Sequence, residues 1–167
     1  APPAIISVYL GDQLGALVDS IVKDKNYTAG KVVQASIGVP ESPIFPKDAT
    51  DRNRTSPFAF TGNKFEFRML GSQANVADAN ICLNTIVADA FEQFANELEG
   101  AADIEKAANK VISRELKAHS RIIFNHDGYG PEWEPEAARR GLLNNKNTAD
   151  ADPLFYEDKN VDVFVHQ

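Results

Sequence analysis

Two short segments carry the side chains best suited to chemistry. In the first, Arg52 and Arg54 lie two residues apart within the polar run 51–56. In the second, Lys64, Glu66 and Arg68 alternate with apolar residues, which places all three on one face of an extended strand. Arginine binds carboxylate and phosphate groups through its planar guanidinium, and a carboxylate can anchor Mg²⁺ or Mn²⁺ beside such anions. Together the two segments suit phosphoryl transfer, in which positioning and charge neutralisation do most of the catalysis.

The same charges also have a purely structural interpretation. Lys64, Glu66 and Arg68 can form the solvated face of an antiparallel sheet. Cross-strand ion pairs to Arg52 and Arg54 would then stabilise the fold by about 0.2–1 kcal/mol each. Taken alone, the pattern is more typical of this surface than of a site.

Other reactive residue types show no spacing that predicts a site. The three histidines lack the spacing of a zinc site, and Cys82 is the only cysteine, which disfavours a transition-metal centre. Cys82 lies just inside an apolar helix, so we expect a small core residue rather than a nucleophile. Trp133 is interpreted as a packing residue, and the turn 128–130 lacks a phosphate-loop pattern.

The charged strand must be positioned by neighbouring strands and a first helix. The run 4–10 is rich in β-branched residues and predicts a buried strand, and Asp12 is placed to cap a helix that ends near Asp24. The region 26–50 is rich in Pro and Gly and predicts an irregular excursion, with one hairpin arm within 31–37. Two extended segments follow at 52–60 and 64–70, joined by a hairpin turn at 61–63, with Phe65 and Phe67 on the buried face.

The second half of the chain is predicted to be helical. Apolar stripes predict helices over 79–99 and 103–119, which Gly100 separates into an antiparallel hairpin. The first stripe includes Phe91 and Phe94 and is interpreted as core. The second helix is expected to bury the residues Ile104, Ala108, Val111, Ile112 and Leu116. A short extended segment at 121–125 and a helix over 131–140 ended by Gly141 follow, and the tail carries valines at alternate positions 161, 163 and 165.

Length and composition limit the kinds of protein that the chain can be. The 167 residues, 43% hydrophobic and 25% charged, suit one ordinary globular domain. The net charge of −7 disfavours nucleic acid or an anionic membrane as the main partner, and no apolar run approaches the roughly 18 residues of a membrane span. The lone cysteine favours a reducing, cytoplasmic setting. The chain opens on Ala1 and enters a strand-like run at once, so we expect a piece of a longer protein.

A family resemblance extends these expectations. The segment 51–71 reads DRNRTSPFAFTGNKFEFRMLG and resembles the large type III glutamine synthetases of bacteria. With the opening run 1–6 and Asn80 at the start of a long helix, it is similar to the C-terminal part of their catalytic domain. The implied fold is α+β, in which antiparallel strands of a catalytic funnel pack against helices. Residues 1–167 would form a single piece, with funnel strands and a helix in 1–98 and a helical, type-specific elaboration in 99–167.

The resemblance also implies an activity and residue roles. The family joins ammonia to glutamate through a γ-glutamyl phosphate, using ATP and Mg²⁺ or Mn²⁺. Glu66 matches its metal-binding strand carboxylate, Arg68 the arginine that faces glutamate and the transferred phosphate, and Arg54 the arginine that stabilises the phosphoryl group. Lys64 matches a basic residue near the nucleotide, and Arg52 is grouped with the substrate- and nucleotide-binding residues. The implied full-length enzyme is a cytoplasmic homo-oligomer, with no nucleic-acid or membrane partner.

Two departures from the family pattern qualify the expected activity. Other types have a further active-site arginine five residues after the one matched by Arg54, where this chain has Ala59. The flap glutamate and the upstream metal ligands of the family have no counterpart in the sequence, so we expect the chain alone to be inactive. The alternative is a non-catalytic scaffold or interaction module that keeps only the fold.

Overall fold

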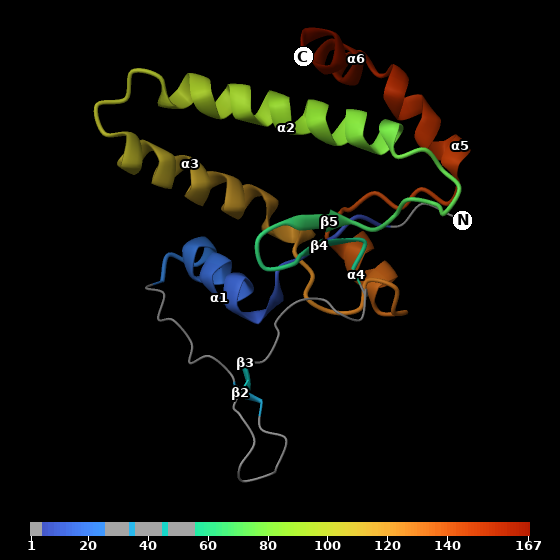
Figure 1. Ribbon diagram of the computed structural model, residues 1–167, viewed down its shortest axis with the longest axis horizontal. Coiled ribbons are helices and arrows are strands. Elements are labelled where there is room, and N and C mark those ends of the chain that lie inside the picture. Colours follow the sequence, from blue (N-terminus) through green and yellow to red (C-terminus); the bar gives the residue numbers. More distant parts are fainter. Residues whose placement is uncertain (1–4, 26–33, 36–44, 47–55) are drawn as a thin grey trace.

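A small mixed sheet lies among helices that make up most of the described chain (Figure 1). The computed structural model describes residues 5–25, 34–35, 45–46 and 56–167. Strand β1 (Val8–Tyr9) pairs in parallel with β4 (Phe58–Phe60), which pairs antiparallel with β5 (Phe65–Phe67). The prediction of antiparallel strands therefore holds for β4 and β5 and is wrong for β1. The connection from β1 to β4 includes helix α1 (Gly11–Val22), and a crossover of this length lets two strands run in the same direction.

The predicted hairpin is confirmed as the pair β4 and β5. Within the described residues both strands are shorter than expected, and 52–55 of the first segment lie outside them. Thr61 donates from its backbone N–H to the carbonyl of Lys64 at 2.8 Å and so closes the turn. Gly62 has φ +93°, a conformation that a residue without a side chain adopts at little cost. The register places Ala59 directly opposite Glu66 and Phe60 opposite Phe65.

Two further strands lie in the region predicted to be irregular. Strand β2 (Gln34–Ala35) pairs antiparallel with β3 (Phe45–Pro46), which agrees with a hairpin arm within 31–37. The remainder of 26–50 lies outside the described residues. The strand predicted over 4–10 is limited to Val8 and Tyr9 within its described part.

The start of α1 is stabilised by a residue distant in sequence. We expected Asp12 to cap this helix, but it lies in the first turn and no side-chain cap comes from Leu10. Instead the side-chain oxygen of Asn125 accepts hydrogen bonds from the backbone N–H groups of Leu10 at 2.9 Å and Gly11 at 3.3 Å. Asn125 thus satisfies donors that would otherwise lack partners at a helix N-terminus.

The helical hairpin is confirmed. Helix α2 (Ala77–Leu98) and helix α3 (Ile104–His119) run antiparallel and project from the sheet (Figure 1). Gly100 has φ +75°, and Asp103 caps α3 by accepting from the N–H of Lys106 at 2.9 Å. Arg114 of α3 joins the helices through two hydrogen bonds to Glu97 of α2, at 2.6 and 2.7 Å.

Burial of the hairpin's apolar stripes is less than predicted. Within the described residues, none of the side chains of α2 is buried, and Phe91 is 67% exposed. In α3 only Val111 is buried, whereas Ile104 and Ile112 are exposed. The stripes therefore identify the helices correctly, but the part of the chain described here covers them only in part.

A buried core cluster lies around helix α4 (Trp133–Arg139), which falls within the helix predicted over 131–140. Trp133 is 1% exposed and stacks on Phe124 with ring centroids 4.1 Å apart, and Ala137 completes the cluster. Arg140 lies over both rings at 5.5–5.6 Å and donates to the carbonyls of Arg121 and Ile123. Gly141, with φ +66°, follows the end of α4.

The segments flanking this core differ from expectation. The extended segment predicted at 121–125 begins as the 3-10 turn η1 (Ser120–Ile122), and Ile123 forms a parallel bridge to Val8. Beyond α4 lie α5 (Thr148–Ala151), the 3-10 turn η2 (Asp152–Tyr156) and α6 (Asp158–His166). The alternating valines, a pattern typical of strands, lie in α6. Among the described residues, no helix is both long and apolar enough to cross a membrane.

Candidate functional site

Strand β5 separates charged from aromatic side chains, as the alternation predicted. On the aromatic face, Phe65 stacks on Phe58 and contacts Phe60, each with ring centroids 5.3 Å apart. We expected Phe65 to be buried, but it is 46% exposed. Because β5 is an edge strand of the three-stranded sheet, its aromatic face is covered from fewer directions than that of a central strand.

The opposite face brings together three of the predicted site residues. Arg68 donates from Nε and Nη2 to the same carboxylate oxygen of Glu66, Oε2, at 3.2 and 3.1 Å. Lys64 Nζ lies 3.6 Å from the other oxygen, Oε1. We name Lys64, Glu66 and Arg68 the Glu66 cluster. The side chain of Arg68 is only 16% exposed, against 39% for Glu66 and 66% for Lys64. Solvent exposure on this face therefore decreases from Lys64 to Arg68.

Ala59 is the cross-strand neighbour of the cluster. It lies opposite Glu66 in the β4–β5 register, and its side chain is fully buried. Side chains of directly opposed residues lie on the same face, with Cβ atoms about 4.5–5.5 Å apart. The departure noted at Ala59 in the sequence is therefore located beside Glu66, at a small and fully buried residue.

The cluster keeps Glu66 ionised. Hydrogen bonds from Arg68 hold the pKa of the Glu66 carboxyl below its usual range. Desolvation is the next largest effect and opposes them, while the charges of Arg68 and Lys64 lower the pKa further. A lowered pKa in the folded state contributes stability at pH values above the ordinary glutamate pKa of about 4.3. That contribution is lost as the pH falls through the lowered pKa. At neutral pH Glu66 is therefore a carboxylate.

Replacing Arg68 tests which cation controls Glu66. We expect Arg68→Met to raise the pKa of Glu66, because the hydrogen bonds from Arg68 are the largest cause of its lowering. Lys64→Met should raise it less, because Lys64 lies farther from the carboxylate. Titration of the side-chain carboxyl carbon by NMR measures both variants. A larger rise for Lys64→Met than for Arg68→Met would contradict this arrangement.

Two predicted site residues, Arg52 and Arg54, lie outside the described residues, so their relation to the Glu66 cluster stays a prediction. In the part of the chain that the structure describes, no three side chains of His, Cys, Asp or Glu form a group able to hold a metal ion. Glu66 can supply one carboxylate to such a site. Mg²⁺ in nucleotide sites is commonly held by one or two carboxylates with waters and phosphate oxygens, so this donor fits as one ligand among several.

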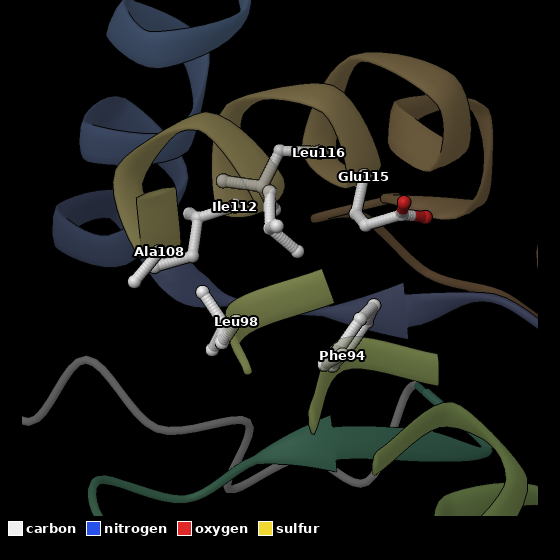
Figure 2. A pocket seen from close by; sticks show the side chains of 7 residues that line it. Phe94, Leu98, Ala108, Ile112, Glu115 and Leu116 are labelled. Carbon is white, nitrogen blue, oxygen red and sulfur yellow. The ribbon is translucent and has the colours of Figure 1, made fainter. Parts of the chain in front are cut away.

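An apolar groove between the hairpin helices has different chemistry. Figure 2 shows Phe94 and Leu98 of α2 facing the same space as Ala108, Ile112 and Leu116 of α3, with Glu115 at its side. The groove has a volume of about 350 Å³. Its lining offers hydrophobic contact and little polar chemistry, so it adds no candidate catalytic group.

The sequence alone did not predict two contacts: Ala59 beside Glu66, and Asn125 at the start of α1. Nothing in a single sequence indicates that Ala59 and Glu66 share one register position, since a shift of one residue would move either to the other face. The contact of Asn125 with the start of α1 joins residues more than 110 positions apart. No local pattern predicts contacts of that kind.

Comparison with known proteins shows sequence similarity to one family. A family model described as glutamine synthetase C-terminal domain matches residues 107–167. Over 98% of its length the chain is 44% identical to a type-3 glutamine synthetase of Dictyostelium discoideum. It is also 42% identical to a glutamine synthetase of Bacteroides fragilis over 86% of its length, and 37% identical to one of Butyrivibrio fibrisolvens over 99%. The chain spans only 21–24% of the length of these relatives.

Proposed function

The chain belongs to the glutamine synthetase family, and from this premise we propose that it forms part of an ATP-dependent ligase that joins ammonia to glutamate. Its similarity to a type-3 member extends over nearly the whole chain. The observation that carries the proposal is the Glu66 cluster, in which one carboxylate is held in place by Arg68 and Lys64 on a single strand face. The cations Arg68 and Lys64, held on one strand face, suit a site that positions anions.

We assign the transfer chemistry to the arginines. In the proposed reaction, an oxygen of the glutamate side chain forms a bond to the γ-phosphorus of ATP, and ADP leaves. Ammonia then attacks the carbonyl carbon of the γ-glutamyl phosphate and loses a proton, and phosphate leaves. Both steps gather negative charge on phosphate oxygens, which guanidinium groups stabilise. Arg68 and Arg54 take this role, while Lys64 and Arg52 would bind the nucleotide and substrate.

Glu66 is proposed as a ligand of Mg²⁺ or Mn²⁺. Arg68 donates two hydrogen bonds to Oε2, and Lys64 Nζ lies 3.6 Å from Oε1. Arg68 thereby fixes the orientation of the carboxylate and holds it ionised, as a metal ligand must be. A divalent ion bound there would offset the negative charge of the ATP phosphates.

The proposed enzyme also implies a setting for the chain. We propose that 1–98 contributes strands and a helix to a catalytic funnel and that 99–167 is a helical elaboration. The C-terminal family model lies within the second part. The substrates would be glutamate, ammonia and ATP, and the whole enzyme would be a cytoplasmic homo-oligomer.

A second candidate function is a non-catalytic scaffold that keeps only the fold. The buried Ala59 opposite Glu66 supports it, because the resemblance implies a further active-site arginine at this position in other types of the family. The cluster of Lys64, Glu66 and Arg68 supports catalysis, because it keeps a carboxylate beside two cations on one strand face.

An activity assay separates the two functions. We expect a full-length glutamine synthetase that carries this sequence to form glutamine from glutamate, ammonia and ATP in the presence of Mg²⁺. The 167-residue chain alone is expected to form none, because one carboxylate cannot build the metal site. A folded full-length protein without ammonia-dependent phosphate release would support the scaffold. Activity of the chain alone above a heat-killed control would overturn the proposal that it needs further segments.

A further inference from the structure

The charged face of the sheet extends beyond the Glu66 cluster to strand β1. In the strand register, Tyr9 of β1 lies opposite Ala59 of β4, which lies opposite Glu66 of β5. Residues that are directly opposed on neighbouring strands have their side chains on the same face of the sheet. Tyr9, Ala59 and Glu66 therefore form one row across the three-stranded sheet, which we name the Glu66 row.

The residues beside this row support the same assignment of faces. Val8 lies opposite Phe58, whose ring stacks on Phe65 on the aromatic face of the sheet. Consecutive residues of a strand have their side chains on opposite faces, so the side chain of Tyr9 belongs to the charged face. The phenol is thus on the same side of the sheet as the Glu66 cluster.

The Glu66 row contains no bulky side chain between the phenol and the carboxylate. Strands β1 and β5 are separated by two strand spacings, about 9–10 Å, with β4 between them. The row member on β4 is Ala59, whose side chain is a single methyl group and is fully buried. Tyr9 and Glu66, which have longer side chains, can therefore reach a common ligand above the middle strand.

The backbone on both sides of Tyr9 is anchored to a distant segment. The carbonyl of Val8 accepts from the N–H of Phe124 at 3.0 Å, and the N–H of Leu10 donates to the side-chain oxygen of Asn125 at 2.9 Å. Tyr9 itself is half-buried, so its ring packs in part and its side chain is still accessible to a ligand. A donor held in place in this way needs little reorganisation when negative charge develops beside it.

We propose that Tyr9 is a further substrate-binding residue, whose phenol O–H donates a hydrogen bond to an oxygen of the phosphoryl group transferred beside the Glu66 cluster. This inference rests on the proposed ligase function. A phenol has an ordinary pKa of about 10, so it is protonated and can donate at neutral pH. Tyrosine hydroxyls are among the donors that stabilise oxygen atoms as these gain negative charge in a transition state.

The first test is Tyr9→Phe in a full-length glutamine synthetase that carries this sequence, since this change removes the donor and keeps the ring. We expect kcat to fall by about tenfold or more, because loss of one such donor commonly lowers kcat by about 100–1,000-fold. Tyr156→Phe, at a side chain that is 80% exposed, is the matched control and should leave kcat unchanged. A normal kcat for Tyr9→Phe would overturn the role of Tyr9.

Two further readouts separate a bond to the substrate from a structural role. At position 9, 4-aminophenylalanine keeps a donor at the end of the ring, whereas 4-methylphenylalanine fills the same space without one. We expect the first to restore most of the kcat lost in Tyr9→Phe and the second to restore none, so equal kcat values would overturn the proposal. We also expect Tyr9→Phe to keep the Mn²⁺ dependence of the unmodified enzyme. A changed dependence would show that Tyr9 acts through Glu66, which would overturn a direct bond to the phosphoryl group.

The unmodified full-length enzyme separates this inference from the function on which it rests. If that enzyme shows no ammonia-dependent release of phosphate from ATP, the proposed function and the role of Tyr9 are both overturned. If it is active and Tyr9→Phe turns over at the normal rate, only the role of Tyr9 is overturned.

Discussion

Replacing Trp133 with alanine is expected to lower the free energy of unfolding by about 3–5 kcal/mol, the usual cost of removing a large buried aromatic side chain. Trp133 is 1% exposed, stacks on Phe124 and lies beneath the guanidinium of Arg140. Its loss removes both contacts and leaves a void in the described core. Because a whole domain is commonly stable by about 5–15 kcal/mol, this single change would remove a large share of the stability.

Denaturant unfolding followed by far-ultraviolet circular dichroism measures this loss without relying on the fluorescence of the residue removed. Trp133→Phe keeps a stacked ring and should cost less than alanine. Phe91→Ala, at a ring that is 67% exposed, is the matched control and should change stability by about 0.5 kcal/mol or less. If Trp133→Ala cost no more than this control, Trp133 would not be the centre of the core.

The same core region includes an acid-sensitive contact. Hydrogen bonds from Arg139 and Arg140 lower the pKa of Glu136 to about 2. The guanidinium of Arg140 contacts the carboxylate of Glu136, two aromatic rings and two backbone carbonyls. This arrangement explains why a charged residue can lie against the most buried side chains.

Local patterns predicted the elements well. The alternation at 64–70 and the turn at 61–63 identified the β4–β5 hairpin, and helical spacing with Gly100 identified α2 and α3. Each of these depends on the geometry of neighbouring residues along the chain. The grouping of Lys64, Glu66 and Arg68 followed from the same rule, since alternate residues of a strand share a face.

Contacts between distant segments could not be predicted in this way. The parallel pairing of β1 with β4 and the capping of α1 by Asn125 depend on how the chain crosses over itself. The apolar stripe of α2 was expected to be buried, but none of its side chains is buried among the described residues. An apolar stripe indicates which face of a helix packs against other segments, but not which segments those are. The position of Ala59 beside Glu66 needed the register, which the sequence leaves open.

Replacing Glu66 with glutamine in a full-length glutamine synthetase that carries this sequence is expected to reduce turnover by roughly tenfold or more. Even changes to outer-shell partners of metal ligands commonly cost about 10–100-fold in affinity or activity. The substitution preserves size and one oxygen but removes the negative charge that Arg68 and Lys64 surround. If Glu66 were only a surface ion-pair partner, the change would cost about 1 kcal/mol of stability or less and leave turnover nearly intact.

The most direct measurement is turnover of the Glu66→Gln enzyme as a function of Mn²⁺ concentration, with thermal unfolding measured on the same sample. Glu99→Gln, at the end of α2, serves as the control for loss of one carboxylate. A metal ligand at position 66 predicts that Glu66→Gln needs a higher Mn²⁺ concentration than both the unmodified enzyme and the control, and that excess Mn²⁺ partly restores its turnover. Near-normal turnover with an unchanged dependence on Mn²⁺ would contradict the role of Glu66 as a metal ligand.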